Sequence, residues 1–251
     1  MPIQSTQWNP TIGTFLFAWC LLTCPESVHA AEAEAGHTFY AGGEVGAALV
    51  GKIDLHNGTT LLSDHIGLHP QGGWAFVGTI GYRFDKAFHV SLDIGYSSNG
   101  TDGVYERAIQ PRIACVVNGI SGSCPPPTSD GRLSATSALT VIHYDVPVGQ
   151  QWTISGAAGG GIASFGLRVT TNPTTVLPKA TTLIDSHDTR FALVAGLDTL
   201  YALSPRLSLV ADYRYLRSSA PHFNAVVGPG PFTADGVLSS HTVRFGIRTP
   251  L

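Results

Sequence analysis

The sequence has few charged residues and, beyond its first 30 residues, no long apolar run. Only 12% of its 251 residues are Asp, Glu, Lys or Arg, whereas soluble domains average roughly 25%. No stretch after residue 30 approaches the roughly 20 apolar residues that a transmembrane helix needs. The net charge of −3 provides no basic stripe, so we expect no nucleic-acid partner. These absences, together with 29 glycines, favour a sheet that faces lipid.

The N-terminal segment lacks any Lys or Arg before its apolar core. It still resembles a secretory signal peptide, because residues 11–24 are apolar but too few to cross a bilayer comfortably as a helix. Val28-His29-Ala30 then provides the small-x-small pattern that precedes a cleavage site. We therefore predict cleavage between Ala30 and Ala31. Residues 1–30 are the expected signal peptide, and residues 31–251 are expected to form one β-barrel domain.

Only four cysteines are present, and two of them would leave with the signal peptide. Cys115 and Cys124 would then meet an oxidising periplasm, where a lone pair close in sequence predicts a disulfide that closes a small loop. Two free thiols are the alternative. The segment between them contains no His, Asp or Glu, which argues against a metal site. Lipid attachment at Cys24 is a weaker interpretation of the leader, because a residue smaller than Thr23 is expected before such a cysteine.

Eight stretches of the chain alternate between apolar and small or polar residues. The clearest is 88–98, where one face is apolar and aromatic and the other is small, polar or charged. The strands that we predict cover residues 38–50, 74–84, 88–98, 133–146, 152–169, 190–203, 207–217 and 237–248.

The links between these strands are alternately short and long. The three short links lie at residues 85–87, 147–151 and 204–205, and the four long links at residues 51–73, 99–132, 170–187 and 218–236. Outer-membrane barrels have short periplasmic turns and long external loops. The pattern predicts an all-β fold: an eight-stranded antiparallel up-and-down transmembrane β-barrel with four long external loops, three short periplasmic turns and both termini in the periplasm.

Charged residues of both signs fall in the middle of the predicted strands, opposite the apolar face. If they share a narrow lumen, they can pair with one another. The lumen charge network that we predict consists of Glu44, Arg83, Asp93, Asp198, Asp212, Arg214 and Arg244. Aromatic residues lie mainly near strand ends, where interface girdles belong. A secreted lipocalin-type calyx with an apolar interior is the alternative, but it leaves the alternation of links unexplained.

Several sequence motifs carry a family resemblance: Ile80-Gly81-Tyr82-Arg83-Phe84, Leu92-Asp93-Ile94-Gly95-Tyr96, Ala211-Asp212-Tyr213-Arg214-Tyr215 and the closing Ser240-His241-Thr242-Val243-Arg244-Phe245-Gly246-Ile247-Arg248. The chain resembles the small OmpA-like and opacity-type outer-membrane barrel proteins of Gram-negative bacteria. The resemblance implies insertion by the barrel assembly machinery, and contact with outer-membrane lipid and lipopolysaccharide. It also implies that the loops meet an external ligand or a host surface. The family usually ends in an aromatic residue, whereas this chain ends in Leu251.

Few residues suggest chemistry. Ser240 and His241 are neighbours near Asp235, but neighbours in a strand point to opposite faces, and Ser239 lacks a recognisable motif. Two clusters of acidic residues and histidines in the long links have spacings that match no known set of metal ligands. The first long link holds Asp54, His56, Asp64, His65 and His69, and the third holds Asp185, His187 and Asp188. We therefore expect no catalytic site, cofactor or metal, and we place His143 and Asp145 with the lumen charges.

Eight strands give an interior just wide enough for side chains to fill. We therefore expect a plugged, non-enzymatic barrel that acts through its loops in envelope structure, adhesion or contact with the host or environment. A narrow solute channel is the main alternative, because the many Gly and Ala residues on the inner face could leave a passage. A lipocalin-like binding protein and a lipid A-modifying membrane enzyme are less favoured.

Overall fold

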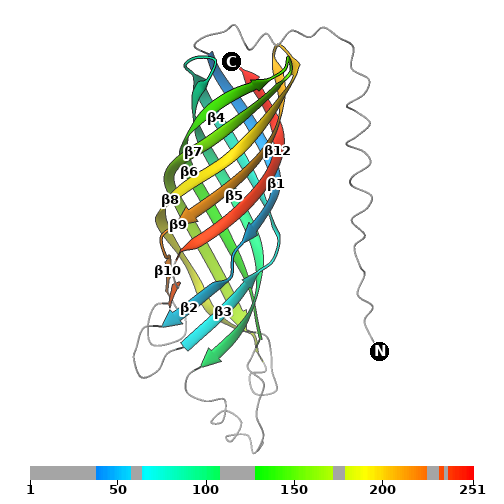
Figure 1. Ribbon diagram of the computed structural model, residues 1–251. Coiled ribbons are helices and arrows are strands. Elements are labelled where there is room, and N and C mark those ends of the chain that lie inside the picture. The colour runs from blue at the N-terminus through cyan, green and yellow to red at the C-terminus, as the bar shows by residue number, and fades with distance from the viewer. Residues whose placement is uncertain (1–37, 58–63, 108–127, 172–178, 225–231, 235–236) are drawn as a thin grey trace, which may run out of the picture.

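The computed structural model describes residues 38–57, 64–107, 128–171, 179–224, 232–234 and 237–251, in which the regular elements are strands (Figure 1). The strands are β1 (Thr38–Val50), β2 (Ile53–Asn57), β3 (Asp64–Pro70), β4 (Gly73–Arg83), β5 (Phe88–Arg107), β6 (Thr128–Val148), β7 (Trp152–Thr171), β8 (Thr181–Ser204), β9 (Leu207–Ser218), β10 (His222–Phe223), β11 (Phe232–Ala234) and β12 (Leu238–Pro250). Among these residues, no helix has the length and apolar character needed to cross a membrane.

Eight of the strands close into a barrel. Each pairs antiparallel with its neighbours in the order β1, β4, β5, β6, β7, β8, β9 and β12, and β12 pairs with β1 to complete the ring. The predicted eight-stranded antiparallel barrel is therefore confirmed. Closure leaves no open sheet edge around this ring, as a structure that crosses a bilayer requires.

Three tight connections lie at one end of the barrel. They join β4 to β5, β6 to β7 and β8 to β9, and the start of β1 and the end of β12 lie at the same end (Figure 1). Gly149 has a φ of 78° in the second connection, a left-handed conformation that glycine adopts without strain. The predicted short links are confirmed, and the start of β1 and the end of β12 lie at the end of the barrel where the sequence predicted the termini.

The predicted long links differ from the structure because much of each is strand. Strands β5 to β8, which we call the hairpin strands, are longer than β1, β4, β9 and β12 and run well past their ends. At this far end β3 pairs with β5, β2 with β3, β11 with β2 and β10 with β11. β10 also contacts β8, where the backbone N–H of His222 donates to Asp188 at 2.6 Å. The wall of the barrel thus continues outward as a second ring.

Buried apolar residues explain this continuation. Leu55 of β2, Leu68 of β3 and Phe223 of β10 are fully buried and belong to one core with Leu167 and Ile184 of the hairpin strands. The polar residues between them made these segments look like loops in the sequence. Their inward positions are apolar, however, so the segments gain more from pairing over a shared core than from remaining in water.

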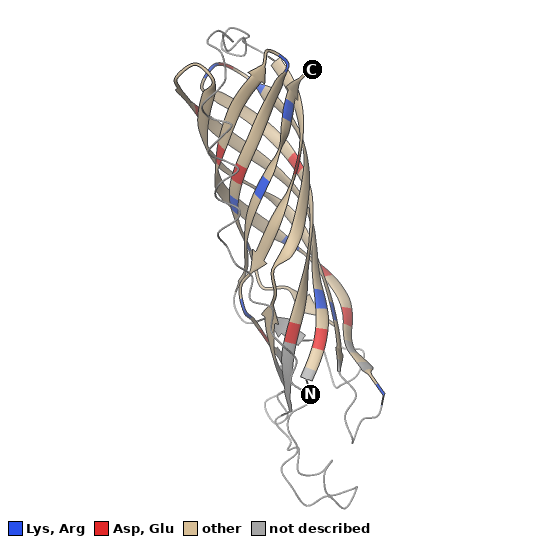
Figure 2. Cartoon of the chain, turned by 90° about the vertical axis from the view of Figure 1, so that its right-hand side faces the viewer, with Lys and Arg blue, Asp and Glu red and all other residues tan. Residues whose placement is uncertain are grey.

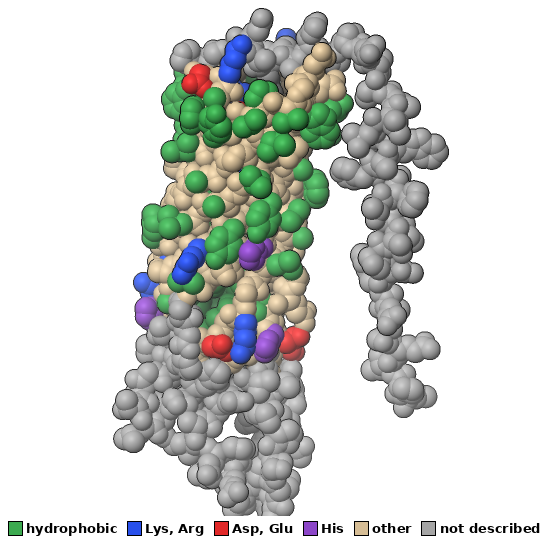
Figure 3. Space-filling view, in the orientation of Figure 1, with side chains coloured by type: hydrophobic (Ala, Val, Ile, Leu, Met, Phe, Trp, Pro, Cys, Tyr) green, Lys and Arg blue, Asp and Glu red, His purple; other side chains and the backbone are tan. Residues whose placement is uncertain are grey.

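The outer face of the barrel is apolar. Large apolar side chains point outward with about half of their surface exposed, as Ile80, Ile94 and Phe245 illustrate. Figure 3 shows such side chains spread over the barrel wall, whereas charged side chains gather toward its ends. Soluble monomers rarely expose apolar surface on this scale. These outward apolar side chains form a belt that faces lipid. A soluble lipocalin-type calyx has the opposite arrangement, with its apolar residues inside.

Aromatic pairs mark both borders of this belt. Phe88 packs on Tyr144 with ring centroids 5.0 Å apart, near the tight connections. Trp74 packs on Tyr96 at 5.3 Å, toward the opposite end. Aromatic rings that are apolar in the body and polar at one tip are favoured at the two membrane–water interfaces.

The lipid-facing belt predicts that a charge is costly in proportion to its depth. Ile94→Arg, near the middle of the belt, should lower the free energy of unfolding by about 2–4 kcal/mol. Val148→Arg, beside a tight connection, should lower it by at most about 1 kcal/mol. The measurement is denaturant unfolding in phospholipid vesicles, followed by tryptophan fluorescence. Equal losses for the two variants would contradict the placement of the belt.

Candidate functional site

The interior of the barrel holds the charges that the sequence placed on the inner face. Of the seven predicted residues, six are buried in the lumen, and Arg83 is partly exposed near the tight connections. Figure 2 shows charged positions of both signs on the strands of the barrel, and a second set on the strands at its lower end. Glu44 and Arg244 come from β1 and β12, Asp93 from β5, Asp198 from β8, and Asp212 and Arg214 from β9.

Two arginines hold the centre of this network. Asp198 and Asp212 face each other directly across β8 and β9, an arrangement of like charges that destabilises a sheet. Arg214 forms ion pairs with both carboxylates, and its contact with Asp212 measures 3.5 Å. Arg244 binds Asp212 through two nitrogens and lies 3.3 Å from Glu44. The two guanidinium groups together therefore contact all three of these carboxylates.

A second carboxylate group extends the network toward the tight connections. Asp145 accepts a hydrogen bond from Ser155 at 2.5 Å, pairs with Arg83 at 3.3 Å and lies 3.2 Å from His89 Nδ1. The rings of His89 and His143 stack with centroids 4.1 Å apart. This places Asp145 and His143 in the network, as the sequence analysis proposed.

Ser91 and His143 join the two parts of the network. His143 Nδ1 lies 2.9 Å from Asp198, and its Nε2 lies 3.0 Å from Ser91 Oγ. Ser91 donates to Asp93 at 2.9 Å, and Thr79 donates to the same carboxylate oxygen at 3.1 Å. The described charges of the lumen thus form one connected set.

Several members of this set were missed as network residues in the sequence analysis. His89, Ser91 and Ser155 share the inner face but carry no fixed charge. Arg248 was also missed, and its guanidinium lies 4.6 Å from the centre of the Tyr40 ring, a cation–π geometry. The signal that could have found them is their alternation in step with the charged residues.

Glycines on the inner face make room for the network. A side chain at Gly81 would run into the ring of Tyr40, and one at Gly196 would run into Arg214. A third position, Gly246, faces Glu44 in the same way. At these three positions the space beside the glycine is occupied by neighbouring side-chain and backbone atoms, so the glycines leave no passage there.

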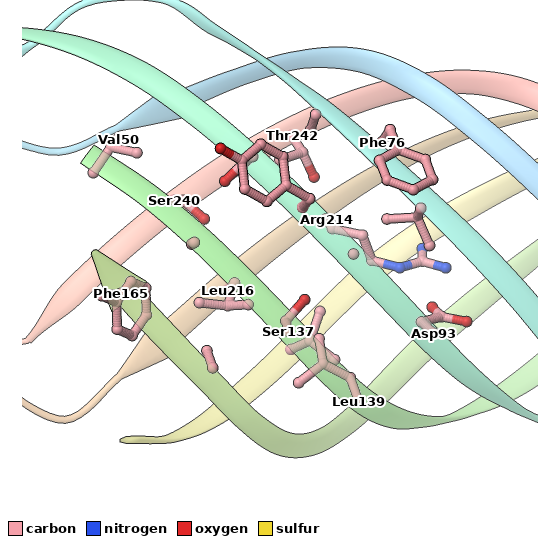
Figure 4. Close-up of a pocket in the computed structure, with 18 of the residues that line it drawn as sticks. Val50, Phe76, Asp93, Ser137, Leu139, Phe165, Arg214, Leu216, Ser240 and Thr242 are labelled. Atoms are coloured by element: carbon pink, nitrogen blue, oxygen red, sulfur yellow. The ribbon is translucent and has the colours of Figure 1, made fainter. Parts of the chain in front are cut away.

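The half of the lumen beyond the network is apolar, which the sequence analysis did not anticipate. Between this apolar core and the charges lies a cavity of about 70 Å³. Figure 4 shows Arg214 and Asp93 at one end of the cavity and Phe165 and Val50 at the other. The space is enough for several water molecules or a small ligand.

Ser91, His143 and Asp198 have the spacing of a nucleophile, a base and an orienting carboxylate. Their setting does not favour catalysis. Ser91 already donates a hydrogen bond to Asp93. All three side chains are almost completely buried. Neither Ser91 nor His143 lines the cavity. A substrate therefore has no approach to Ser91 Oγ through this space.

The other polar groups that the sequence singled out do not gather into one site, although His56 and His65 lie opposite each other on β2 and β3. Ser240 lines the cavity, whereas His241 points outward, with its Nδ1 2.7 Å from the hydroxyl of Tyr213. Asp54 pairs with Lys52 at 3.1 Å, and Asp185 with Arg168 at 3.6 Å. Within the part of the chain that the structure describes, no three His, Cys, Asp or Glu side chains converge as a metal site would require.

Some predicted residues lie outside the described ranges. These are the cleavage-site residues Ala30 and Ala31, the cysteines Cys115 and Cys124, and Asp235. The signal peptide and the disulfide remain predictions.

Comparison with known proteins finds matches over most of the chain. A family model described as "Outer membrane protein beta-barrel domain" matches residues 17–247. An uncharacterized protein of Brucella abortus is 22% identical over 197 residues, which cover 71% of this chain and 68% of the relative.

Two solved structures are also similar. Neisserial surface protein A is 16% identical, with a TM-score of 0.38 over 86% of this chain and 99% of that one. The outer membrane protease OmpT from Escherichia coli is 7% identical, with a TM-score of 0.47 over 85% of this chain and 97% of that one. A surface protein and a protease thus both appear, so these likenesses assign no role.

Loss of Arg214 should destabilise the barrel, because it leaves two facing carboxylates without their shared partner. Arg214→Ala should lower the free energy of unfolding by about 3–5 kcal/mol, the range for breaking a buried ion pair. Arg217→Ala, an exposed arginine on the same strand, is the matched control and should change it by less than about 0.5 kcal/mol. The measurement is urea unfolding in detergent micelles. Equal midpoints for Arg214→Ala and the parent would show that the network is not a source of stability.

Proposed function

The chain belongs to the outer membrane protein beta-barrel domain family, and from this premise we propose that it is a closed, non-enzymatic barrel that acts through its extracellular end. It is an outer-membrane β-barrel protein. The roles that fit are envelope structure, adhesion, and contact with the host or environment.

The connected lumen network is the observation that supports closure. Its arginines and carboxylates bridge several strands of the barrel, and inner-face glycines are filled by neighbouring side chains. Beyond the network, a buried apolar core occupies the lumen. An ion would have to disrupt paired charges and then cross an apolar region that offers it no compensating ligands.

The second ring of strands supports a role at the surface. It extends the wall past the apolar belt, and its outer face carries charged pairs such as Arg168 with Asp185. Arg190 and Asp188 pair at 2.7 Å near the junction of β8 and β10. A charged rim of this kind suits contact with lipopolysaccharide head groups or with an external ligand, and the barrel wall suits outer-membrane lipid. Insertion by the barrel assembly machinery is part of the same proposal.

The buried Ser91, His143 and Asp198 group is the feature that an enzymatic role would need to use. We infer that this group is structural, because Ser91 does not line the cavity and donates a hydrogen bond to Asp93.

The closed lumen predicts an absence of conductance. The purified protein, reconstituted in planar bilayers, should give no reproducible open steps in single-channel recordings. A gel shift on heating in detergent checks that the barrel is folded before reconstitution, and a general porin prepared in the same way checks the bilayers. Reproducible steps from the folded protein would refute closure and establish the channel alternative.

The proposed surface role also predicts which lysines face outward. The chain has three lysines, and Lys52 and Lys179 lie toward the second ring while Lys86 lies in a tight connection. A bulky, membrane-impermeant amine reagent should label intact cells that carry the parent protein. The Lys52→Arg, Lys179→Arg double variant should be labelled only after the outer membrane is permeabilised. Labelling of that variant in intact cells would place the tight connections outside and overturn the proposal.

A further inference from the structure

Two arginines face each other on the outer surface of the barrel, among the charged positions beyond the apolar belt (Figure 2). Arg132 of β6 lies directly opposite Arg168 of β7, and both side chains point outward and are exposed. Residues opposite each other in an antiparallel sheet have Cβ atoms roughly 4.5–5.5 Å apart, and like charges there are destabilising. The lumen holds the reverse case, in which Arg214 bridges Asp198 and Asp212.

Only part of the repulsion between the two arginines is relieved within the described residues. Asp185 of β8 pairs with Arg168 at 3.6 Å, but both side chains are more than half exposed. Such a surface pair contributes only about 0–1 kcal/mol. Arg132 forms no ion pair with a described residue. Because guanidinium groups bind phosphate oxygens through pairs of N–H donors, an anion between the two arginines would satisfy both.

The neighbouring residues determine the side from which an anion can approach. Farther from the membrane, Asp102 and Asp130 are exposed and face each other across β5 and β6. Asp130 lies on the same face as Arg132, two residues away. Toward the membrane, the next outward positions on β6 and β7 are Ser134 and Gly166, which carry no charge. An anion is therefore repelled on the solvent side of the arginines and not on the membrane side.

The distance of the arginines from the belt selects the kind of anion. The last outward apolar side chain of β7 is Ile162, and Arg168 follows six residues later. Six residues of a strand tilted by roughly 35–45° rise about 15 Å along the barrel axis. The head-group region of a phospholipid bilayer is only about 5–8 Å thick on each side. The phosphate of an ordinary phospholipid therefore lies below the arginines, whereas a phosphate on a large sugar head group reaches them.

We propose that Arg132 and Arg168 together bind a phosphate of lipopolysaccharide, a lipid with a phosphorylated sugar head group. Both guanidinium groups donate to the phosphate oxygens, and the phosphate removes the repulsion between them. The sugars lie against the uncharged positions Ser134 and Gly166, and the acyl chains lie on the belt. The inference rests on the proposed function, because it requires the second ring to lie outside the cell, and it assigns the lipid contact to two residues.

The test is native mass spectrometry of the folded protein in detergent micelles, titrated with rough-type lipopolysaccharide in the presence of EDTA. The chelator removes divalent cations that could bridge a phosphate to Asp102 and Asp130. The Arg132→Gln, Arg168→Gln double variant should bind this lipid at least about tenfold more weakly than the parent, the effect of losing hydrogen bonds to a charged group. The same lipopolysaccharide without its phosphates should bind the parent protein equally weakly.

The matched control is the Lys86→Gln, Arg206→Gln double variant, which removes the same charge from exposed positions in the tight connections. It should bind like the parent, and a gel shift on heating checks that each variant is folded. Phosphatidylglycerol and inorganic phosphate are the competitors, and neither should displace the lipopolysaccharide.

Four results would overturn the proposal: equal affinity of the parent and the arginine variant, an equal loss in the control variant, displacement by phosphatidylglycerol, or displacement by inorganic phosphate. The last two would assign the arginines to a phospholipid or to a free anion. The lysine labelling of intact cells separates this failure from that of the proposed function. If labelling places the second ring outside while the arginine variant binds normally, only the lipopolysaccharide site is refuted.

Discussion

Asp198 and Asp212 lie opposite each other on neighbouring strands, and their mutual repulsion is the constraint around which the lumen is built. Arg214 relieves it by pairing with both. Arg244 and His143 then occupy the outer sides of the two carboxylates. Because these partners come from β6, β8, β9 and β12, satisfying one pair of like charges fixes the relative positions of strands far apart in the sequence.

The same constraint divides the interior into two parts. Buried charges must be paired and hydrogen-bonded, so they gather near the tight connections, where glycines admit their side chains. Toward the other end the inward positions become apolar, and Leu55, Leu68 and Phe223 extend that core beyond the membrane. The cavity lies where these two kinds of packing meet. In the function that we propose, the polar part closes the lumen, and the apolar part supports the second ring.

Much of the barrel could be predicted from the sequence, since alternation assigns each strand residue to one face. The predicted bounds of β1 match the structure, and the mid-strand charges lie in the lumen. Ion-pair partners could not be predicted, because Arg244 meets Glu44 only when β12 closes on β1. The strands of the second ring were missed because their inward apolar residues are few and stand among Gly, Ser and His.

We infer that the buried charges act as one coupled unit. A double-mutant cycle on Arg214 and Asp198 tests it most directly, with unfolding free energies measured for Arg214→Ala, Asp198→Ala and the double variant. Coupling predicts that the double variant loses less stability than the sum of the single losses, by about 1–3 kcal/mol. Losses that add to within about 0.5 kcal/mol would contradict the account.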